Sequence, residues 1–256
     1  MRRLSGRRTA RYEADLYLID GPVLLAEAIE SGVEIEHIYV EPDALDSNVL
    51  GSYGVDELVT PVLEGSLAKV LDVVNPNGMV AVARMSLGDA AAMANSAIEA
   101  DAPILMMADV ADPGNVGTLL RAAEAAGCVG VVVAGNCADP FSPKVVRASA
   151  GSLFRIPVAS EVDPVHAIRN LATAGVTAFA TVIEGGVHPE SADLGGAVAI
   201  VVGNEAHGLD GDTIAACDGS VSIPMSGRVE SLNAAMAATI VLFEAARQRR
   251  DAHRCG

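Results

Sequence analysis

Three segments of the sequence carry polar side chains at spacings that could serve chemistry. The first runs through Asp112-Pro113-Gly114-Asn115 and reaches Arg121 six residues later. An amide and a guanidinium can orient a hydroxyl group or hold a phosphate. Because Gly117 and Arg121 are one helical turn apart, Arg121 can point back over the turn. A second interpretation stays open, in which Asn115 caps a helix and Arg121 is a solvated surface residue.

The second segment is Val201–Leu209, in which an apolar strand ends in a loop with two glycines and a carboxylate. Glycine at the end of a strand lets a ligand approach the backbone closely. Gly203 and Gly208 could serve this purpose, with Glu205 as the charged group of the site. The alternative is an ordinary strand-to-helix turn, in which Glu205 is only a surface charge.

The third segment is Ile223–Asn233, which precedes an apolar helix. Ser231 suits the N-cap of that helix, the commonest reason for a serine at such a position. Asn233 is harder to explain, because asparagine has a poor helix propensity and a run of alanines follows it. We therefore expect the amide of Asn233 to serve in a site.

The elements that position these segments alternate regularly after Ala102. Apolar runs predict strands at 104–108, 129–133, 176–181, 198–202 and 220–223, and helices at 116–126, 144–150, 164–174 and 232–247. This alternation predicts a parallel sheet covered on both faces. Such sheets bind ligands at the carboxyl ends of their strands, where the loops under discussion lie.

The chain is long enough for two modest domains, with 256 residues of which 51% are hydrophobic. Its first part predicts a small α/β domain with strands at 16–19, 37–40 and 79–83, a helix at 22–31 that ends at Gly32, and a turn at 75–78. The alanine-rich stretch after this part is typical of a connector. We expect an α/β protein with domains at 1–92 and 102–256 and a linker at 93–101.

Several classes of protein are not indicated. Apolar runs fall short of the roughly 20 residues of a membrane span, and the basic N-terminus lacks the apolar stretch of a secretory signal, so we expect a cytoplasmic location. Cys128, Cys137, Cys217 and Cys255 have no metal-ligand spacing, which predicts reduced thiols and no metal site. The glycine motifs of dinucleotide-binding and P-loop proteins are absent, as is the GxSxG motif of hydrolases.

The net charge of −16 argues against a nucleic-acid partner, because phosphate binding normally needs clustered lysine and arginine. The positive charge is nevertheless concentrated at the two ends. Of the 17 basic residues, five lie within the first 11 residues and four within the last ten: Arg2, Arg3, Arg7, Arg8, Arg11, Arg247, Arg249, Arg250 and Arg254. These ends could grip a phosphate backbone, or they could be solvated, disordered tails.

Taken together and in this order, the three segments resemble the motifs of the SpoU (TrmH-like) family of RNA ribose 2′-O-methyltransferases, in the SPOUT superfamily. The shared features are Asn115, Gly117 and Arg121, then the loop 203–208, then Ile-Pro-Met followed by Ser-Leu-Asn at 231–233. Residues 142–151 also resemble the family's segment between the first two motifs. One departure is Ala206, where the family usually has glycine, and we expect the extra methyl group to be tolerated.

The resemblance implies a trefoil-knotted methyltransferase domain at 102–256 and an RNA-binding domain at 1–92, similar in outline to ribosomal proteins of the L30e type. It implies a homodimer whose site is completed at the subunit interface. The implied cofactor is S-adenosylmethionine (AdoMet), and the residues that would bind it are Thr181, Gly203, Asn204, Ile223, Met225 and Leu232.

The catalytic group implied by the resemblance is Asn115, Arg121, Glu205, Ser231 and Asn233. The family's arginine is proposed as the base, but a guanidinium effectively never loses its proton in a protein. We therefore expect Arg121 to clamp the target phosphate, with Glu205 anchoring Arg121 or a nearby loop. We expect ribosomal RNA (rRNA) as substrate in preference to transfer RNA (tRNA). The alternatives are a knotted methyltransferase of RNA bases and a non-catalytic RNA-binding assembly factor.

Overall fold

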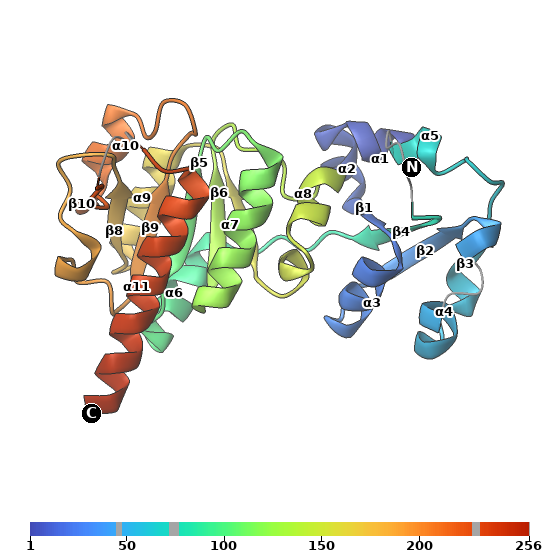
Figure 1. Ribbon diagram of the computed structural model, residues 1–256, viewed down its shortest axis with the longest axis horizontal. Helices are drawn as coiled ribbons and strands as arrows, with labels where there is room; N and C mark the ends of the chain where they lie inside the picture. Colours follow the sequence, from blue (N-terminus) through green and yellow to red (C-terminus); the bar gives the residue numbers. More distant parts are fainter. Residues whose placement is uncertain (45–47, 72–76, 227–230, 256) are drawn as a thin grey trace. The chain divides into compact units, whose positions relative to one another are not determined.

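The computed structural model describes residues 1–44, 48–71, 77–226 and 231–255. Of the turn expected at 75–78, the first two residues lie outside this part, as do residues 227–230 of the third segment and the side chain of Cys255. Contacts divide the chain into two compact units (Figure 1). The first unit joins Met1–Ser86 with Asp139–Arg155, and the second joins Leu87–Ala138 with Ile156–Gly256.

The first unit contains a four-stranded mixed sheet in the order β1-β4-β2-β3. Strand β4 pairs antiparallel with β1 and β2, and β2 pairs parallel with β3. The strands are β1 (Leu16–Asp20), β2 (Ile35–Val40), β3 (Val59–Pro61) and β4 (Met79–Arg84), and helices α3 (Pro22–Glu30), α4 (Asn48–Tyr53) and α5 (Ala68–Leu71) connect them. Helix α3 ends as expected, with Gly32 in a left-handed conformation at φ 76°. The predicted small α/β domain is confirmed.

The N-terminal residues form helices α1 (Arg2–Gly6) and α2 (Arg8–Ala14), not a solvated tail. Leu4 packs into the core of the first unit, with 9% of its surface exposed. Arg11 is 3% exposed, and its Nε donates a hydrogen bond to Asp139 at 2.6 Å. A buried charge needs such a partner. Arg11 is therefore a structural residue, unlike the other four arginines of this end, which are exposed.

Residues 139–155 form an excursion that packs with the first unit, although they lie within the range expected for the second domain. The excursion contains helix α8 (Pro143–Ala148). Arg147 contacts the buried carboxylate of Asp20 at 3.0 Å, and the rings of Phe141 and Tyr17 meet edge to face at 5.2 Å. These contacts join the excursion to strand β1. They explain why a boundary drawn along the sequence differs from the observed units.

The second unit is built on a six-stranded sheet in the order β10-β8-β9-β5-β6-β7, with every pair parallel. Its strands are β5 (Ile104–Ala108), β6 (Gly130–Ala134), β7 (Val158–Glu161), β8 (Thr177–Thr181), β9 (Val198–Val202) and β10 (Gly219–Val221). Its helices are α6 (Ala90–Ala100), α7 (Pro113–Ala126), α9 (Pro164–Thr173), α10 (Gly211–Ala216) and α11 (Ala234–Cys255). The predicted parallel sheet is confirmed.

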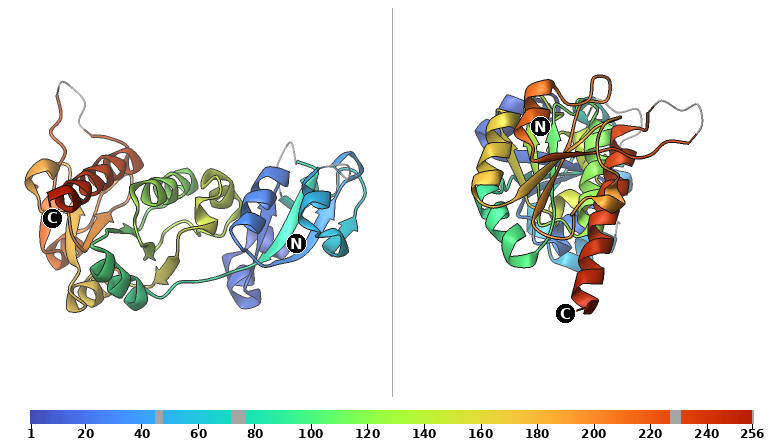
Figure 2. Two further views of the ribbon diagram at one scale, coloured as in Figure 1. Left: turned by 90° about the horizontal axis from the view of Figure 1, so that it is seen from below. Right: turned by 90° about the vertical axis from the view of Figure 1, so that its left-hand side faces the viewer.

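Helices cover both faces of this sheet, as the alternating pattern predicts. Helices α7 and α11 lie side by side on one face, and α6 and α9 lie on the other (Figure 2). The central strand β5 is buried throughout, and its alternate residues Ile104, Met106 and Ala108 pack with α6 and α9. The described helices include none that is long and apolar enough to cross a membrane.

The expected linker at 93–101 falls almost entirely within helix α6. Asp89 caps this helix by accepting hydrogen bonds from the backbone amides of Ala91 and Ala92. Met93, Ala94 and Ala97 are buried against the sheet. The segment differs from the expectation because its small side chains give a weak hydrophobic pattern and yet allow close packing.

Candidate active site

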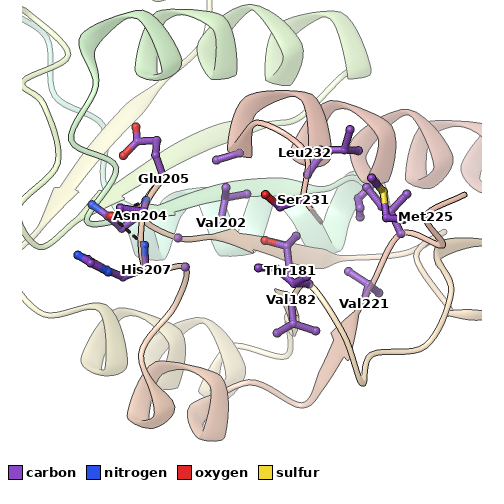
Figure 3. Close-up of a pocket in the computed structure, with 18 residues that line it drawn as sticks. Thr181, Val182, Val202, Asn204, Glu205, His207, Val221, Met225, Ser231 and Leu232 are labelled. Atoms are coloured by element: carbon purple, nitrogen blue, oxygen red, sulfur yellow. Dashed lines mark hydrogen bonds between the residues drawn. The ribbon is translucent and has the colours of Figure 1, made fainter. Parts of the chain in front are cut away.

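A cavity lies at the carboxyl ends of β8, β9 and β10, where an α/β sheet normally binds its ligand. Its lining comes from within residues 181–183, 202–208, 221–225 and 231–241. Asn204, Glu205 and His207 lie toward one end of the cavity, and Met225 lies toward the other (Figure 3). The second and third sequence segments therefore meet in one place.

All six residues expected to bind a cofactor line this cavity: Thr181, Gly203, Asn204, Ile223, Met225 and Leu232. Two of the expected catalytic residues, Glu205 and Ser231, line it as well. Sequence reasoning missed His207 and the apolar walls, which include Val202, Val221 and Val241. The signal that could have identified Val202 is its place at the last residue of a buried strand.

The carboxylate of Glu205 joins the loop after β9 to the turn after β5. It accepts hydrogen bonds from the backbone amides of Ala111 at 3.2 Å and Asp112 at 3.0 Å, and from the side-chain amide of Asn115 at 2.9 Å. Partial burial raises the pKa of Glu205, but these hydrogen bonds outweigh it and hold the pKa below its usual value. Glu205 is thus an ionised anchor of the loop.

Asn115 and Asn233 lie in direct contact, although they are 118 residues apart. The side-chain nitrogen of Asn233 donates to the side-chain oxygen of Asn115 at 3.0 Å. Because Asn115 also donates to Glu205, its amide has one possible orientation. The first and third segments are therefore joined through a chain of three side chains, from Glu205 to Asn115 to Asn233.

The helix caps differ from the two that the sequence suggested. Asp112, not Asn115, caps α7, and it accepts from the backbone amide of Asn115 at 2.9 Å. Asn233, not Ser231, occupies the capping position before α11, and it accepts from the amides of Ala235 at 2.9 Å and Met236 at 3.3 Å. Asn233 both caps a helix and contacts Asn115, which accounts for asparagine at this position.

The loop 204–208 is held by its own first residue. The side-chain oxygen of Asn204 accepts from the backbone amides of Ala206 at 2.9 Å and His207 at 3.3 Å. A side chain at Gly203 would meet the backbone of Gly208 at 2.4 Å, so this position requires glycine. Ala206 is exposed and its φ is not positive, which explains why the loop accommodates its methyl group.

Arg121 lies outside the cavity. It is exposed on helix α7, six residues beyond Asn115 and so about 9 Å further along the helix axis. Within the described part of the chain no ion pair engages it, and Glu205 contacts the turn at 111–112 in its place. Of the five expected catalytic residues, the structure brings four together and leaves Arg121 apart.

The described residues contain no cluster of His, Cys, Asp and Glu that could hold a metal ion. Cys128, Cys137 and Cys217 are free thiols, and Cys137 is the one that is buried. Burial raises the pKa of the Cys137 thiol to about 11, which keeps it protonated and unreactive at neutral pH. The thiols therefore offer the site neither a nucleophile nor a metal ligand.

Comparison with known proteins identifies the family. The model of the SpoU rRNA Methylase family matches residues 102–243, more than half of the chain. The chain belongs to this family. Residues 1–81 of this SpoU protein match the MRM3-like substrate binding domain. The family membership agrees with the expected α/β fold, in which a mixed-sheet domain is followed by a SpoU domain with a six-stranded parallel sheet.

Relatives with named activities match nearly the whole length of this SpoU protein. The 23S rRNA (uridine(2479)-2′-O)-methyltransferase of Streptomyces viridochromogenes is 32% identical over 96% of this chain and 88% of its own. The 23S rRNA (guanosine(2553)-2′-O)-methyltransferase RlmP of Bacillus subtilis is 30% identical over 91% of this chain and 89% of its own. The crystal structure of the SpoU methyltransferase AviRb from S. viridochromogenes with AdoMet has a TM-score of 0.83 and 30% identity, and the match covers 97% of this chain and 96% of that one.

The cavity fits the cofactor implied by this family. Apolar walls at Val202, Val221 and Leu232 suit the flat adenine ring, and the polar loop 203–208 suits groups that need hydrogen bonds. The hydroxyl of Thr181 donates to the carbonyl of Val201 at 3.0 Å, which leaves its oxygen lone pairs available within the cavity. The same residues can therefore hold both the apolar and the polar parts of AdoMet.

We predict that Glu205→Gln destabilises the protein by about 1 kcal/mol at pH 7, a small value because the side chain is exposed. The new amide nitrogen would face a backbone N–H and lose one of three hydrogen bonds. Because the pKa of Glu205 is lowered, its stabilisation is present above about pH 4.3 and is lost as the pH falls below that value. Urea unfolding of both proteins at pH 7 and pH 3.5 measures the difference.

The exposed Glu99 of α6 provides the matched control, and Glu99→Gln should leave the stability unchanged. A loss at Glu205 that is equally large at both pH values would contradict the anchoring role of its ionised carboxylate.

Proposed function

We propose that this protein transfers the methyl group of AdoMet to a ribose 2′-hydroxyl of 23S rRNA, the activity in the names of its two relatives. The observation that carries the proposal is the chain of side chains from Glu205 through Asn115 to Asn233, which lies beside the cavity. It unites all three sequence segments in one hydrogen-bonded group. Such preorganised amides can orient a ribose hydroxyl without further rearrangement.

AdoMet, when bound, supplies an electrophilic methyl group that a 2′-hydroxyl can attack in line. The protein's own task is to hold the hydroxyl in that line and to stabilise the charge that develops on its oxygen. The free hydrogen-bonding positions of Asn115 and Asn233 are suited to the ribose. Ser231, exposed within the cavity lining, is suited to the cofactor carboxylate or the substrate. The proton leaves to a substrate phosphate or to water.

Arg121 acts in this proposal as a clamp for the phosphate of the target nucleotide. Its guanidinium keeps its charge at every relevant pH, which excludes it as a base but suits it to a bidentate phosphate contact. Its exposure and lack of an ion pair among the described residues leave it available to RNA. Its position outside the cavity agrees with a site completed by a second copy of the chain.

The activity is tested by incubating the protein with methyl-labelled AdoMet and separate rRNA and tRNA pools, followed by alkaline hydrolysis. Label in alkali-resistant dinucleotides of rRNA supports the proposal, because a 2′-O-methyl group blocks cleavage. Label on bases alone would indicate a base methyltransferase, and RNA binding without transfer would indicate a non-catalytic assembly factor.

We predict that Arg121→Ala lowers kcat/KM for RNA by a factor of about 10² to 10³, as expected when a charged contact to the transition state is lost. AdoMet affinity, measured by calorimetry, should stay unchanged, because Arg121 lies outside the cavity. Arg121→Lys should retain part of the activity, since it keeps the charge but loses the bidentate geometry. Arg169→Ala, at an exposed arginine of α9, is the control. Near-normal turnover of Arg121→Ala would refute the clamp.

The exposed arginines of α1 and α2 are the proposed contact of the first unit with the RNA backbone. Arg2 of α1, Arg8 of α2 and Arg7 between the two helices are exposed, whereas Leu4 and Arg11 are buried. The guanidinium of Arg8 lies 5.2 Å from the centre of the Tyr12 ring, a cation–π arrangement that orients it. A folded surface of this kind can hold phosphates at fixed positions within an acidic protein.

We predict that the triple variant Arg2→Gln, Arg7→Gln, Arg8→Gln binds rRNA more weakly and with a smaller dependence on salt. Each lost phosphate contact should reduce the slope of log K against log salt by about 0.7 to 0.9. Deleting the N-terminus is a poorer test, because it would also remove the buried Arg11. Arg84→Gln is the control, since Arg84 is already paired with Glu34 and Glu36. An unchanged slope in the triple variant would end the proposal.

A homodimer formed through helix α11 is proposed as well. Met236, Ile240 and Phe243 form an apolar stripe at helical spacing, with 62%, 44% and 44% of their surfaces exposed. The adjoining groove is rimmed by Glu244 and Arg247, among other charges of both signs. A surface that is apolar at its centre and carries both charges at its edge can pair with itself about a twofold axis.

The expected cytoplasmic location stays a prediction.

We predict that Met236→Glu, Phe243→Glu converts the dimer into a monomer in analytical ultracentrifugation, because burying two carboxylates is unfavourable. Methyl transfer should fall with the dimer, since the proposed site needs both copies. Val162→Glu, at an isolated valine with 93% exposure, controls for the loss of surface hydrophobicity. A wild-type protein that is monomeric at micromolar concentration and fully active would contradict the proposal.

A further inference from the structure

Asp109 occupies an unusual position at the end of the central strand β5. Its φ is 58°, in the left-handed region that side chains other than glycine rarely adopt. Aspartate tolerates this region better than most residues because its short carboxylate can hydrogen-bond nearby. Here the carboxylate accepts from the backbone amide of Asn136 at 2.7 Å, in the loop after β6. The conformation of Asp109 is thus fixed by a partner 27 residues away.

The neighbouring residue Gly135 leaves the space that this carboxylate occupies. A side chain built at Gly135 would come within 2.5 Å of the Asp109 carboxylate oxygen. The backbone amide of Asp109 also donates to the carbonyl of Ala134 at 3.2 Å. The residues that follow β6 therefore leave space for the side chain of Asp109 and hydrogen-bond to it.

The left-handed turn at Asp109 directs the backbone that follows toward the cavity loop. The carbonyl of Asp109 accepts from the side-chain nitrogen of Asn204 at 2.9 Å. The amides of Ala111 and Asp112 donate to Glu205, as described above. Three backbone groups within four residues thus bind two consecutive side chains of the loop. Their directions depend on the turn that begins at Asp109.

Asn204 carries this constraint into the cofactor cavity. Its nitrogen is held by Asp109, and its oxygen holds the amides of Ala206 and His207. Because each end of the Asn204 amide is engaged, the side chain cannot flip without breaking the loop. All three of Asn204, Ala206 and His207 line the cavity. The side-chain amide of Asn204 therefore links the backbone of Asp109 to the wall of the cavity.

We propose that Asp109 is a positioning residue for methyl transfer, which sets the conformation of loop 204–208 for binding AdoMet through Asn204 and Glu205. This inference rests on the proposed function. Asp109 itself does not line the cavity, so it acts through these two residues. Position 109 must meet two conditions. The residue must tolerate a left-handed backbone, and its side chain must accept a hydrogen bond from the backbone amide of Asn136.

Three substitutions separate these two conditions. Asp109→Asn tolerates the left-handed backbone and keeps an oxygen acceptor, Asp109→Gly keeps the backbone freedom alone, and Asp109→Ala keeps neither. We expect AdoMet affinity by calorimetry to be close to wild type for asparagine, reduced several-fold for glycine, and reduced roughly tenfold or more for alanine. The KM for RNA should change less than the AdoMet affinity, since the phosphate contacts proposed above, Arg121 and the arginines of the N-terminus, lie elsewhere.

Asp101 is a matched control in the same unit. It too is a left-handed aspartate, with φ 45°, but it ends helix α6 and has no contact with the cavity loop. Asp101→Ala should lower thermal stability through the same unfavourable left-handed backbone and leave AdoMet affinity unchanged. A merely structural role of Asp109 would make these two variants behave alike.

A second measurement needs no cofactor. Amide hydrogen exchange of Ala206 and His207 in the protein without AdoMet should be faster in Asp109→Ala than in wild type or Asp101→Ala, because Asn204 would no longer be held. Wild-type exchange rates and wild-type AdoMet affinity in Asp109→Ala would overturn the inference. A failure of the proposed function is distinguishable, because the wild-type protein would then transfer no methyl group to ribose, while the exchange result would still report on Asp109.

Discussion

The carboxylate of Glu205 is the contact on which the geometry of the site depends. Its donors lie 90 to 94 residues away in the sequence, two in the turn between β5 and α7 and the third, Asn115, in the first turn of α7. The two strands that lead into these loops, β5 and β9, are neighbours in the sheet. The sheet brings the strand ends close, and one ionised side chain then fixes the two loops relative to each other. Asp109 supplies the backbone direction that allows this contact.

Asn115 and Asn233 extend the same constraint to the helices. Each amide uses its nitrogen and its oxygen in different contacts, so neither can rotate without breaking a bond. Because Asn233 also caps α11, the start of that helix is tied to the start of α7. The side chains proposed to orient the substrate therefore also fix the starts of α7 and α11 relative to each other. Rigidity of this kind is what a preorganised transfer site requires.

The sequence by itself determined much of this protein. Strands β5 and β9 have the bounds that their apolar runs predict, because a buried parallel strand needs a continuous apolar stretch. Family resemblance selected six residues for the cofactor, and all six line one cavity. The hydrophobic pattern predicted secondary structure least well where side chains are small or where many residues are charged. Helix α6 was taken for a linker, and α1 and α2 for a tail.

Only the tertiary structure decided which partners the polar side chains find. The sequence offered Asn115 and Ser231 as helix caps, whereas Asp112 and Asn233 occupy those positions. It offered Arg11 as one more surface charge, whereas Asp139 holds it in the interior. The caps themselves join residues two or three apart, but Asn233 also contacts Asn115, 118 residues away, and Arg11 lies 128 residues from Asp139. Hydrophobic periodicity is a local property of the chain, but the partner of a buried or oriented polar group is chosen by proximity across about a hundred residues, which exists only after the sheet has formed.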